Sequence, residues 1–169
     1  MEDQITTGQT IKKWGVIYGA IVTLVTLVSM ILDYQTGFLI FVNMAVAIGM
    51  YVLAMKEFKT ENSGLMSFGE GFKMAFGMAA IAGVMRGVVS YVYMKFIDPE
   101  YSERALETVS EDLRAQGLAE EQIEQTMSFT AGLSNPEVNF FATIISLLLG
   151  ALIIGAIVSA IMKNQEDEF

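Results

Sequence analysis

Arg86 is the residue whose type and position offer the clearest chemistry, because it interrupts an apolar segment in the stretch GVMRGVVS. A permanently charged guanidinium near the middle of a membrane-spanning helix costs roughly 2.5 to 3.5 kcal/mol on insertion scales. Small side chains at Ala79, Gly83 and Ser90 share the helical face of Arg86. We therefore expect Arg86 to point into a helical bundle and away from lipid.

Three uses of Arg86 follow from its surroundings. The preferred one is a buried ion pair with Asp33, at the end of the first apolar segment, which would fix the register of two helices. The second is a site for an anion or a lipid phosphate, and the third is a proton or ion pathway. Neutral side chains that could also meet Arg86 are Thr23, Thr26, Ser29 and Asn43.

The composition removes much of the usual catalytic chemistry. The 169 residues include no Cys and no His, so thiol nucleophiles, thiolate metal sites and the commonest general base are excluded. We expect no catalytic residue, no cofactor and no metal site, and we expect that the protein is not an enzyme. A net charge of −9 argues against a nucleic-acid partner, because affinity for phosphate backbones comes from Lys and Arg.

Apolar segments of membrane-spanning length dominate the chain, which has a hydrophobic fraction of 53% and a mean hydropathy of +0.49. About 20 apolar residues cross the hydrocarbon layer as a helix, and only helices satisfy the backbone of such segments internally. We expect an all-α, integral membrane four-helix bundle that forms a single membrane domain over residues 1–169, without a cleavable signal peptide. The predicted spans are residues 14–32, 38–55, 72–97 and 140–162.

The segment between the third and fourth spans, about residues 98–135, is predicted to form an acidic helical hairpin outside the membrane. Asp98 would be the N-cap of its first helix and Pro99 the first helical residue. Asn135 followed by Pro136 would cap the fourth span. The acidic surface would be either a solvated face or a docking surface for a partner or a cation.

Lys residues near the span ends predict the orientation. They lie at one end of the bundle if four spans are present, whereas the hairpin lies at the other; they are Lys12, Lys13, Lys56, Lys59, Lys73 and Lys163. We therefore expect a multi-pass protein of the bacterial inner membrane with both termini in the cytoplasm.

Two further patterns predict packing and helix capping. Small residues at four-residue spacing allow helices to approach closely in lipid, and the expected packing residues are Gly15, Gly19, Ala79, Gly83, Gly87, Gly150 and Gly155. Ser67 and Glu70 stand at the spacing of a capping box at the start of the third helix.

The order of several motifs resembles a known family. The stretches SFGEGFKMAFGMAAIAG, YVYMKFIDPEY, GLAEEQIEQ and NPEV follow one another at characteristic spacing, and nearly the whole chain is similar to the Bacteroidota membrane family known as domain of unknown function 4199. The resemblance implies an inner-membrane protein without an established activity and without known catalytic residues.

Two functions from different classes are expected. The first is a binding protein, an accessory or scaffold subunit of a membrane enzyme or envelope assembly. The alternative is a small oligomeric transporter or channel in which Arg86 lines a path for an anion or a lipid headgroup. The expected partners are membrane lipid and either a membrane protein or further copies of this chain.

Overall fold

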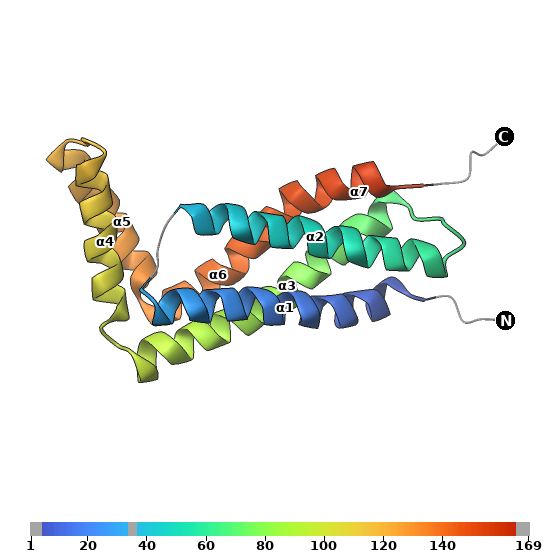
Figure 1. Ribbon diagram of the computed structural model, residues 1–169, viewed down its shortest axis with the longest axis horizontal. Helices are drawn as coiled ribbons and strands as arrows, with labels where there is room; N and C mark the ends of the chain where they lie inside the picture. Colours follow the sequence, from blue (N-terminus) through green and yellow to red (C-terminus); the bar gives the residue numbers. More distant parts are fainter. Residues whose placement is uncertain (1–4, 34–36, 165–169) are drawn as a thin grey trace.

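The computed structural model describes residues 5–33 and 37–164 and consists of helices (Figure 1). Two five-residue stretches are π-helical, and each continues the α-helix before it. In chain order the elements are α1 (Thr7–Ile31), α2 (Phe38–Glu61), α3 (Phe68–Val92), η1 (Tyr93–Ile97), α4 (Tyr101–Ala115), α5 (Glu120–Ser134), α6 (Pro136–Gly150), η2 (Ala151–Gly155) and α7 (Ala156–Met162).

Within the described residues, four continuous helical segments are long and apolar enough to cross a membrane. They are Thr7–Ile31, Phe38–Glu61, Phe68–Ile97 and Pro136–Met162. This confirms the predicted all-α membrane bundle. The helices extend beyond some predicted spans because a helix continues into polar sequence, and α2 runs through the polar stretch that follows Met55 to end at Glu61.

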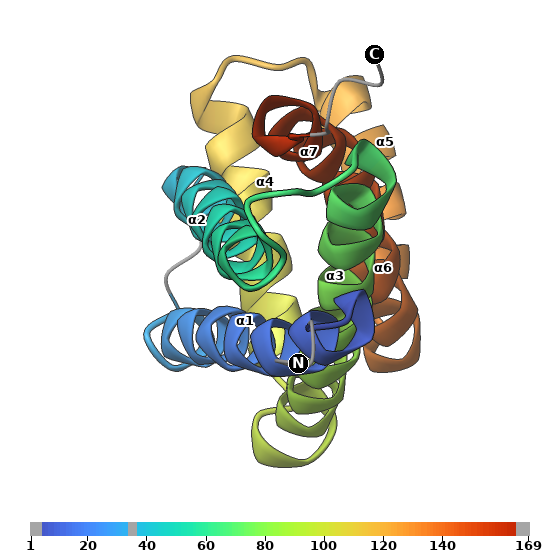
Figure 2. The same ribbon diagram turned by 90° about the vertical axis from the view of Figure 1, so that its right-hand side faces the viewer.

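The third span lies at the centre of the bundle. It packs along α1 on one side and along α6 on another, whereas α2 packs mainly on α1 (Figure 2). The core between them is built from methionine, alanine and tyrosine side chains, including Tyr18, Tyr51, Met55, Met74 and Met78. Flexible Met side chains fill the irregular space between helices whose small residues bring the backbones close together.

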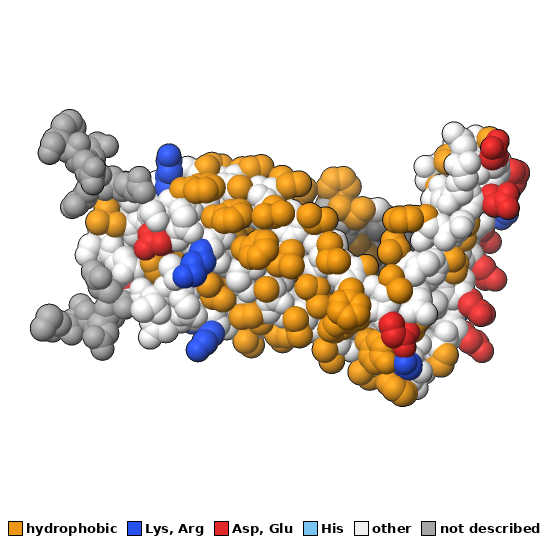
Figure 3. Space-filling view, turned by 180° about the vertical axis from the view of Figure 1, so that it is seen from behind, with side chains coloured by type: hydrophobic (Ala, Val, Ile, Leu, Met, Phe, Trp, Pro, Cys, Tyr) orange, Lys and Arg blue, Asp and Glu red, His pale blue; other side chains and the backbone are white. Residues whose placement is uncertain are grey.

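The surface divides into three zones along the bundle axis. Apolar side chains cover its middle, as expected for contact with lipid, whereas acidic side chains cover the far face of the hairpin (Figure 3). Lys side chains lie at the opposite end of the bundle. We call these ends the hairpin end, which carries α4 and α5, and the Lys-rich end, which carries Lys12, Lys13, Lys56, Lys59, Lys73 and Lys163.

Glycines mark the closest helix contacts. A Cβ added at Gly15 would lie 3.4 Å from the Cα of Met78 in α3, and one added at Gly19 would lie 3.2 Å from the Cα of Ala82. On the other side of α3, Cβ atoms at Gly83 and Gly87 would meet α6, and one at Gly155 would lie 2.7 Å from the Cβ of Ala75. Ala79 is fully buried.

Gly150 differs from the other small residues predicted to pack between helices. Nothing lies within 4 Å of a Cβ added there, so this residue is not at a close helix contact. The neighbouring residues Ala151 and Gly155 are buried and Gly155 packs on α3, whereas Gly150 lies on another face of the same span and borders a cavity.

Replacing Gly83 with Val should separate α3 from α6. The added Cβ would lie 3.1 Å from the Cα of Ile144, a backbone atom that can move only with its helix. Overpacking of this kind costs about 1 to 3 kcal/mol, so thermal unfolding in detergent should begin at a lower temperature. The control is Gly49→Val, because nothing lies within 4 Å of a Cβ at Gly49; equal effects of both changes would contradict the packing account.

Side-chain caps define where three helices begin. At the start of α3, the hydroxyl of Ser67 accepts from the amide of Glu70 at 3.2 Å, and the amide of Ser67 donates to the Glu70 carboxylate at 2.8 Å. Thr6 and Gln9 form the equivalent pair before α1. The side chain of Asn135 caps α6, in which Pro136 is the first residue. These caps satisfy backbone amides that have no partner inside the helix.

Candidate functional site

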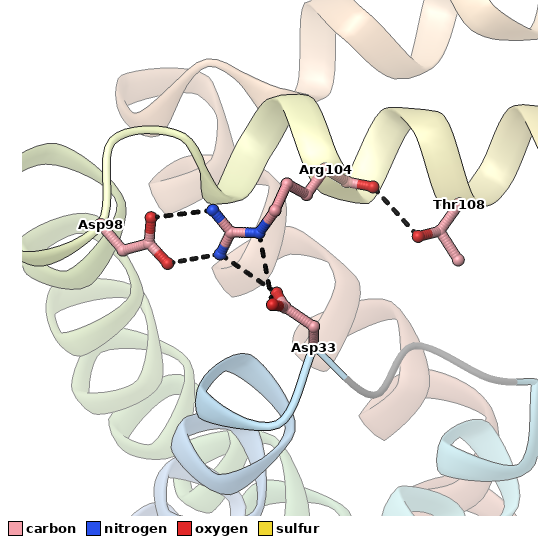
Figure 4. A network of polar contacts seen from close by, with 4 residues as sticks. All are labelled: Asp33, Asp98, Arg104 and Thr108. Atoms are coloured by element: carbon pink, nitrogen blue, oxygen red, sulfur yellow. Dashed lines mark hydrogen bonds and ion pairs between the residues drawn. The ribbon is translucent and has the colours of Figure 1, made fainter.

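Asp33 forms its ion pair with Arg104, not with Arg86 as we predicted. The Arg104 guanidinium, from the first turn of α4, donates to both carboxylate oxygens of Asp33, with distances of 3.2 and 3.3 Å (Figure 4). It also donates to Asp98, with its shortest bond at 2.6 Å. We call Asp33, Asp98 and Arg104 the hairpin clamp, because they join the ends of α1 and η1 to α4.

The predicted pair does not form because Arg86 and Asp33 lie at different levels along the bundle axis. Arg86 lies eleven residues before Ile97, the end of η1, which corresponds to about 16 Å along the helix at 1.5 Å per residue. Asp33 lies beyond the end of α1 and has a positive φ of 47°. Arg104 lies at the same level as Asp33, so its side chain reaches the carboxylate first. Helix α4 of the hairpin therefore provides the partner of Asp33, which the spacing of residues within the spans does not indicate.

Asp98 has the predicted capping contacts and also a partner that was not predicted. The assigned helix α4 begins at Tyr101, but the backbone amides of Glu100 and Tyr101 hydrogen-bond to the Asp98 carboxylate, as expected for a residue that caps this turn. The carboxylate also faces Arg104, and this guanidinium, followed by the two amides, holds the pKa of the Asp98 carboxyl below its usual value by hydrogen bonding to the charged form.

A cavity of about 760 Å³ lies behind the hairpin clamp, in the half of the bundle nearest the hairpin. Its walls come from α1, α2, α3 and α6, and one face of α4 covers the hairpin end. Tyr18, Tyr51 and Ile154 lie among the lining residues furthest from the hairpin. Pockets of this size hold ligands as large as drug molecules.

Arg86 lines this cavity and is its source of positive charge. Among the described residues that line the cavity, Arg86 is the one cation and Asp112, which is exposed, the one carboxylate. The Nε atom of Arg86 is buried and has no hydrogen-bond partner among the described residues. Tyr18 of α1 and Tyr101 of α4 are its electrostatic neighbours. Arg86 therefore points inward, as its small neighbours predicted, but borders open space.

Several polar side chains around the cavity donate hydrogen bonds to backbone carbonyl oxygens of their own helices. The hydroxyls of Thr26 and Ser29 each donate to the carbonyl oxygen four residues earlier, at 2.8 Å. The amide nitrogen of Asn43 does the same toward Leu39, and its Oδ1 atom is buried without a hydrogen-bond partner in the described part of the chain. Asn43 and Arg86 thus both line the cavity, and each carries a buried polar atom without a hydrogen-bond partner among the described residues.

The cavity exists because α2 and α6 diverge toward the hairpin end. α2 contacts α7 and η2 near the Lys-rich end, whereas α6 runs away from it toward the hairpin (Figure 1). Both π-helical stretches contribute lining residues, Met94 from η1 and Ile154 from η2. π-Helical turns often lie at functional sites, but the sequence carries no recognised signal for them.

The fold and the cavity define a helical membrane protein with a ligand-sized cavity in its bundle that is lined by Arg86. The family described as "Protein of unknown function (DUF4199)" matches residues 13–164, and the chain belongs to this family. No curated protein and no solved structure matches the chain.

Proposed function

We propose that this protein binds an anionic ligand in the cavity lined by Arg86. The observation that carries the proposal is the position of Arg86, which lines the cavity and whose buried Nε atom has no hydrogen-bond partner among the described residues. Of the three uses that the sequence left open for Arg86, an anion site fits this arrangement best.

The energetics of the buried Nε donor of Arg86 support the proposal. A buried donor without a partner costs about 1 to 3 kcal/mol, and more when the group is charged. Hydrogen bonds to charged groups return about 1.5 to 3 kcal/mol each. An anion beside Arg86 would therefore offset a cost that the empty protein carries. A phosphate group suits a guanidinium particularly well, because planar donors meet two of its oxygens at once.

Binding can be tested with the purified full chain in neutral detergent. Inorganic phosphate is added as the probe, and thermal unfolding is followed by circular dichroism. We expect the unfolding temperature to rise with phosphate concentration for the unaltered protein and to stay constant for Arg86→Gln. The matched control is Lys95→Gln, which removes an exposed cation paired with Glu137 at the same end of the bundle. A response that survives in Arg86→Gln, or is absent from the unaltered protein, would contradict the proposal.

We further propose that the protein lies in a bacterial inner membrane with the Lys-rich end in the cytoplasm, on the basis of the Lys distribution. The chain has no Cys, so single cysteines report their side of the membrane directly. Ser128→Cys in α5 should react with a membrane-impermeant maleimide added to spheroplasts, whereas Ser63→Cys, between α2 and α3, should react only after lysis. The reverse pattern would contradict this orientation.

A second candidate function is the accessory or scaffold role. It is supported by the exposed carboxylates Glu103, Glu107 and Glu111, which form one stripe along the far face of α4. The test is purification of the tagged protein from its native membrane in gentle detergent. A stoichiometric membrane protein that is lost when the three residues are changed to Gln would support this role, whereas its retention would argue against the stripe as a contact surface.

A further inference from the structure

We infer that the anion in the cavity is the phosphate ester of a membrane lipid, which enters sideways from the bilayer between α2 and α6. This inference rests on the proposed anion-binding function and specifies the ligand class. The shared chemistry is a phosphate group, which could belong either to a lipid or to a free ion in water. The shape and the lining of the cavity favour the lipid.

The cavity has a lateral mouth within the membrane-spanning part of the molecule. Ile40 and Met44 of α2 line the cavity, yet 70% and 41% of their surfaces are exposed. Ser146 of α6 lines it and is exposed as well. All three residues belong to segments long and apolar enough to span the membrane, so the surface that they share faces lipid. A ligand can pass there without crossing water.

The lining separates into an apolar part and a polar part, as an amphiphile requires. Leu39, Ile40 and Met44 on α2 and Leu147 on α6 offer an apolar path from the mouth inward. Arg86 supplies the charge from α3. Acyl chains placed along the first group would keep contact with apolar side chains while the phosphate reaches the guanidinium. An inorganic ion would leave most of the 760 Å³ unfilled.

Two buried atoms specify the headgroup further. The Nε atom of Arg86 needs an acceptor, and the Oδ1 atom of Asn43 needs a donor. A phosphate oxygen provides the first and a headgroup hydroxyl provides the second. A phosphate ester that carries a hydroxyl-bearing headgroup therefore offers both an acceptor and a donor for these two atoms.

Gly150 offers a way to block the lipid without touching the anion site. It lines the cavity, and nothing lies within 4 Å of a Cβ added there, so a side chain can start at this position without a backbone clash, and Gly150→Phe is expected to occupy part of the cavity. Gly49→Phe is the matched control, since its Cβ also meets nothing within 4 Å and Gly49 is not among the lining residues. Ser146→Trp, at the exposed mouth, is a second blocking variant if Gly150→Phe fails to fold.

The experiment compares two probes on the full chain after delipidation in detergent. Phosphatidylglycerol retention from mixed phosphatidylglycerol and phosphatidylcholine vesicles is measured by native mass spectrometry, and inorganic phosphate binding by thermal stabilisation. We expect the unaltered protein and Gly49→Phe to retain phosphatidylglycerol. Gly150→Phe and Arg86→Gln should retain at least tenfold less. Inorganic phosphate should stabilise Gly150→Phe as it does the unaltered protein, and should not stabilise Arg86→Gln.

The outcomes separate the two proposals. If phosphate stabilises the protein through Arg86 but lipid retention is the same in all folded variants, the lipid inference is overturned and the anion-binding function remains. If neither probe responds to Arg86→Gln, both are overturned. Equal loss of lipid from Gly49→Phe and Gly150→Phe would also overturn the inference, because the loss would not depend on the cavity.

Discussion

Replacing Arg86 with Met should make the empty protein more stable and remove its response to phosphate. Met keeps an apolar stem of similar length and discards a buried donor that has no partner among the described residues. Removing such a group recovers on the order of 1 to 3 kcal/mol, whereas most substitutions destabilise a protein. Loss of a charge-assisted hydrogen bond to the ligand should weaken phosphate binding about 10-fold to 100-fold. Thermal unfolding with and without phosphate measures both effects.

The control for this prediction is Lys95→Met, which removes a cation that is exposed and paired with Glu137. It should neither raise the unfolding temperature of the empty protein nor change the phosphate response. A lower unfolding temperature for Arg86→Met would contradict our account, because it would mean that Arg86 is a satisfied structural residue. Such opposite changes in stability and binding are the expected signature of a functional group that is costly to bury.

Replacing Arg104 with Gln should release the hairpin from the bundle. Arg104 is the residue that connects α4 to both Asp33 and Asp98 (Figure 4), and without it two carboxylates face each other with no cation between them. We expect backbone amides of α4 to exchange at least tenfold faster in hydrogen-exchange mass spectrometry, while those of α3 change little. The matched control is Arg114→Gln, since Arg114 pairs with Glu120 inside the hairpin. Equal exchange in both variants would contradict the clamp.

The hairpin clamp also predicts a dependence on pH. Arg104 lowers the pKa of Asp98 in the folded protein, so the clamp is fully formed above the unfolded value of about 4 and is lost only as the pH falls below it. Spin labels at Glu61→Cys and Thr126→Cys should keep one distance from pH 7 to pH 5. The distance distribution should broaden below about pH 4, and a broadening that begins near pH 6 would contradict this assignment.

Much of the fold could be predicted from the sequence because its signals are local. Long apolar segments require helices in lipid, and Ser67, Glu70 and Asn135 mark helix starts through short-range hydrogen bonds. The inward direction of Arg86 could also be predicted, because small residues on its own helix identify the packed face. Each of these features depends on residues a few positions apart in the chain.

The site could not be predicted to the same extent, because it depends on how separate helices diverge. The cavity arises where α2 and α6 separate, and Gly150 borders it although its spacing matches that of the packing glycines. The predicted pair of Asp33 with Arg86 is wrong because the sequence does not give the relative depth of residues on different helices. The signals available for the clamp were the two arginines of an otherwise acidic hairpin, Arg104 and Arg114.

The most direct test of the account is the distance between arginine nitrogen and lipid phosphorus in a bilayer. The chain has three arginines, at positions 86, 104 and 114, so arginine labelled with ¹⁵N gives few signals in solid-state nuclear magnetic resonance. In phosphatidylglycerol bilayers we expect strong ¹⁵N–³¹P dephasing that remains in Arg104→Lys combined with Arg114→Lys, which removes two labels but keeps a cation in the clamp, and disappears in Arg86→Lys. Dephasing that is absent from the double variant, or unchanged in Arg86→Lys, would show that the phosphate does not lie beside Arg86 and would contradict the account.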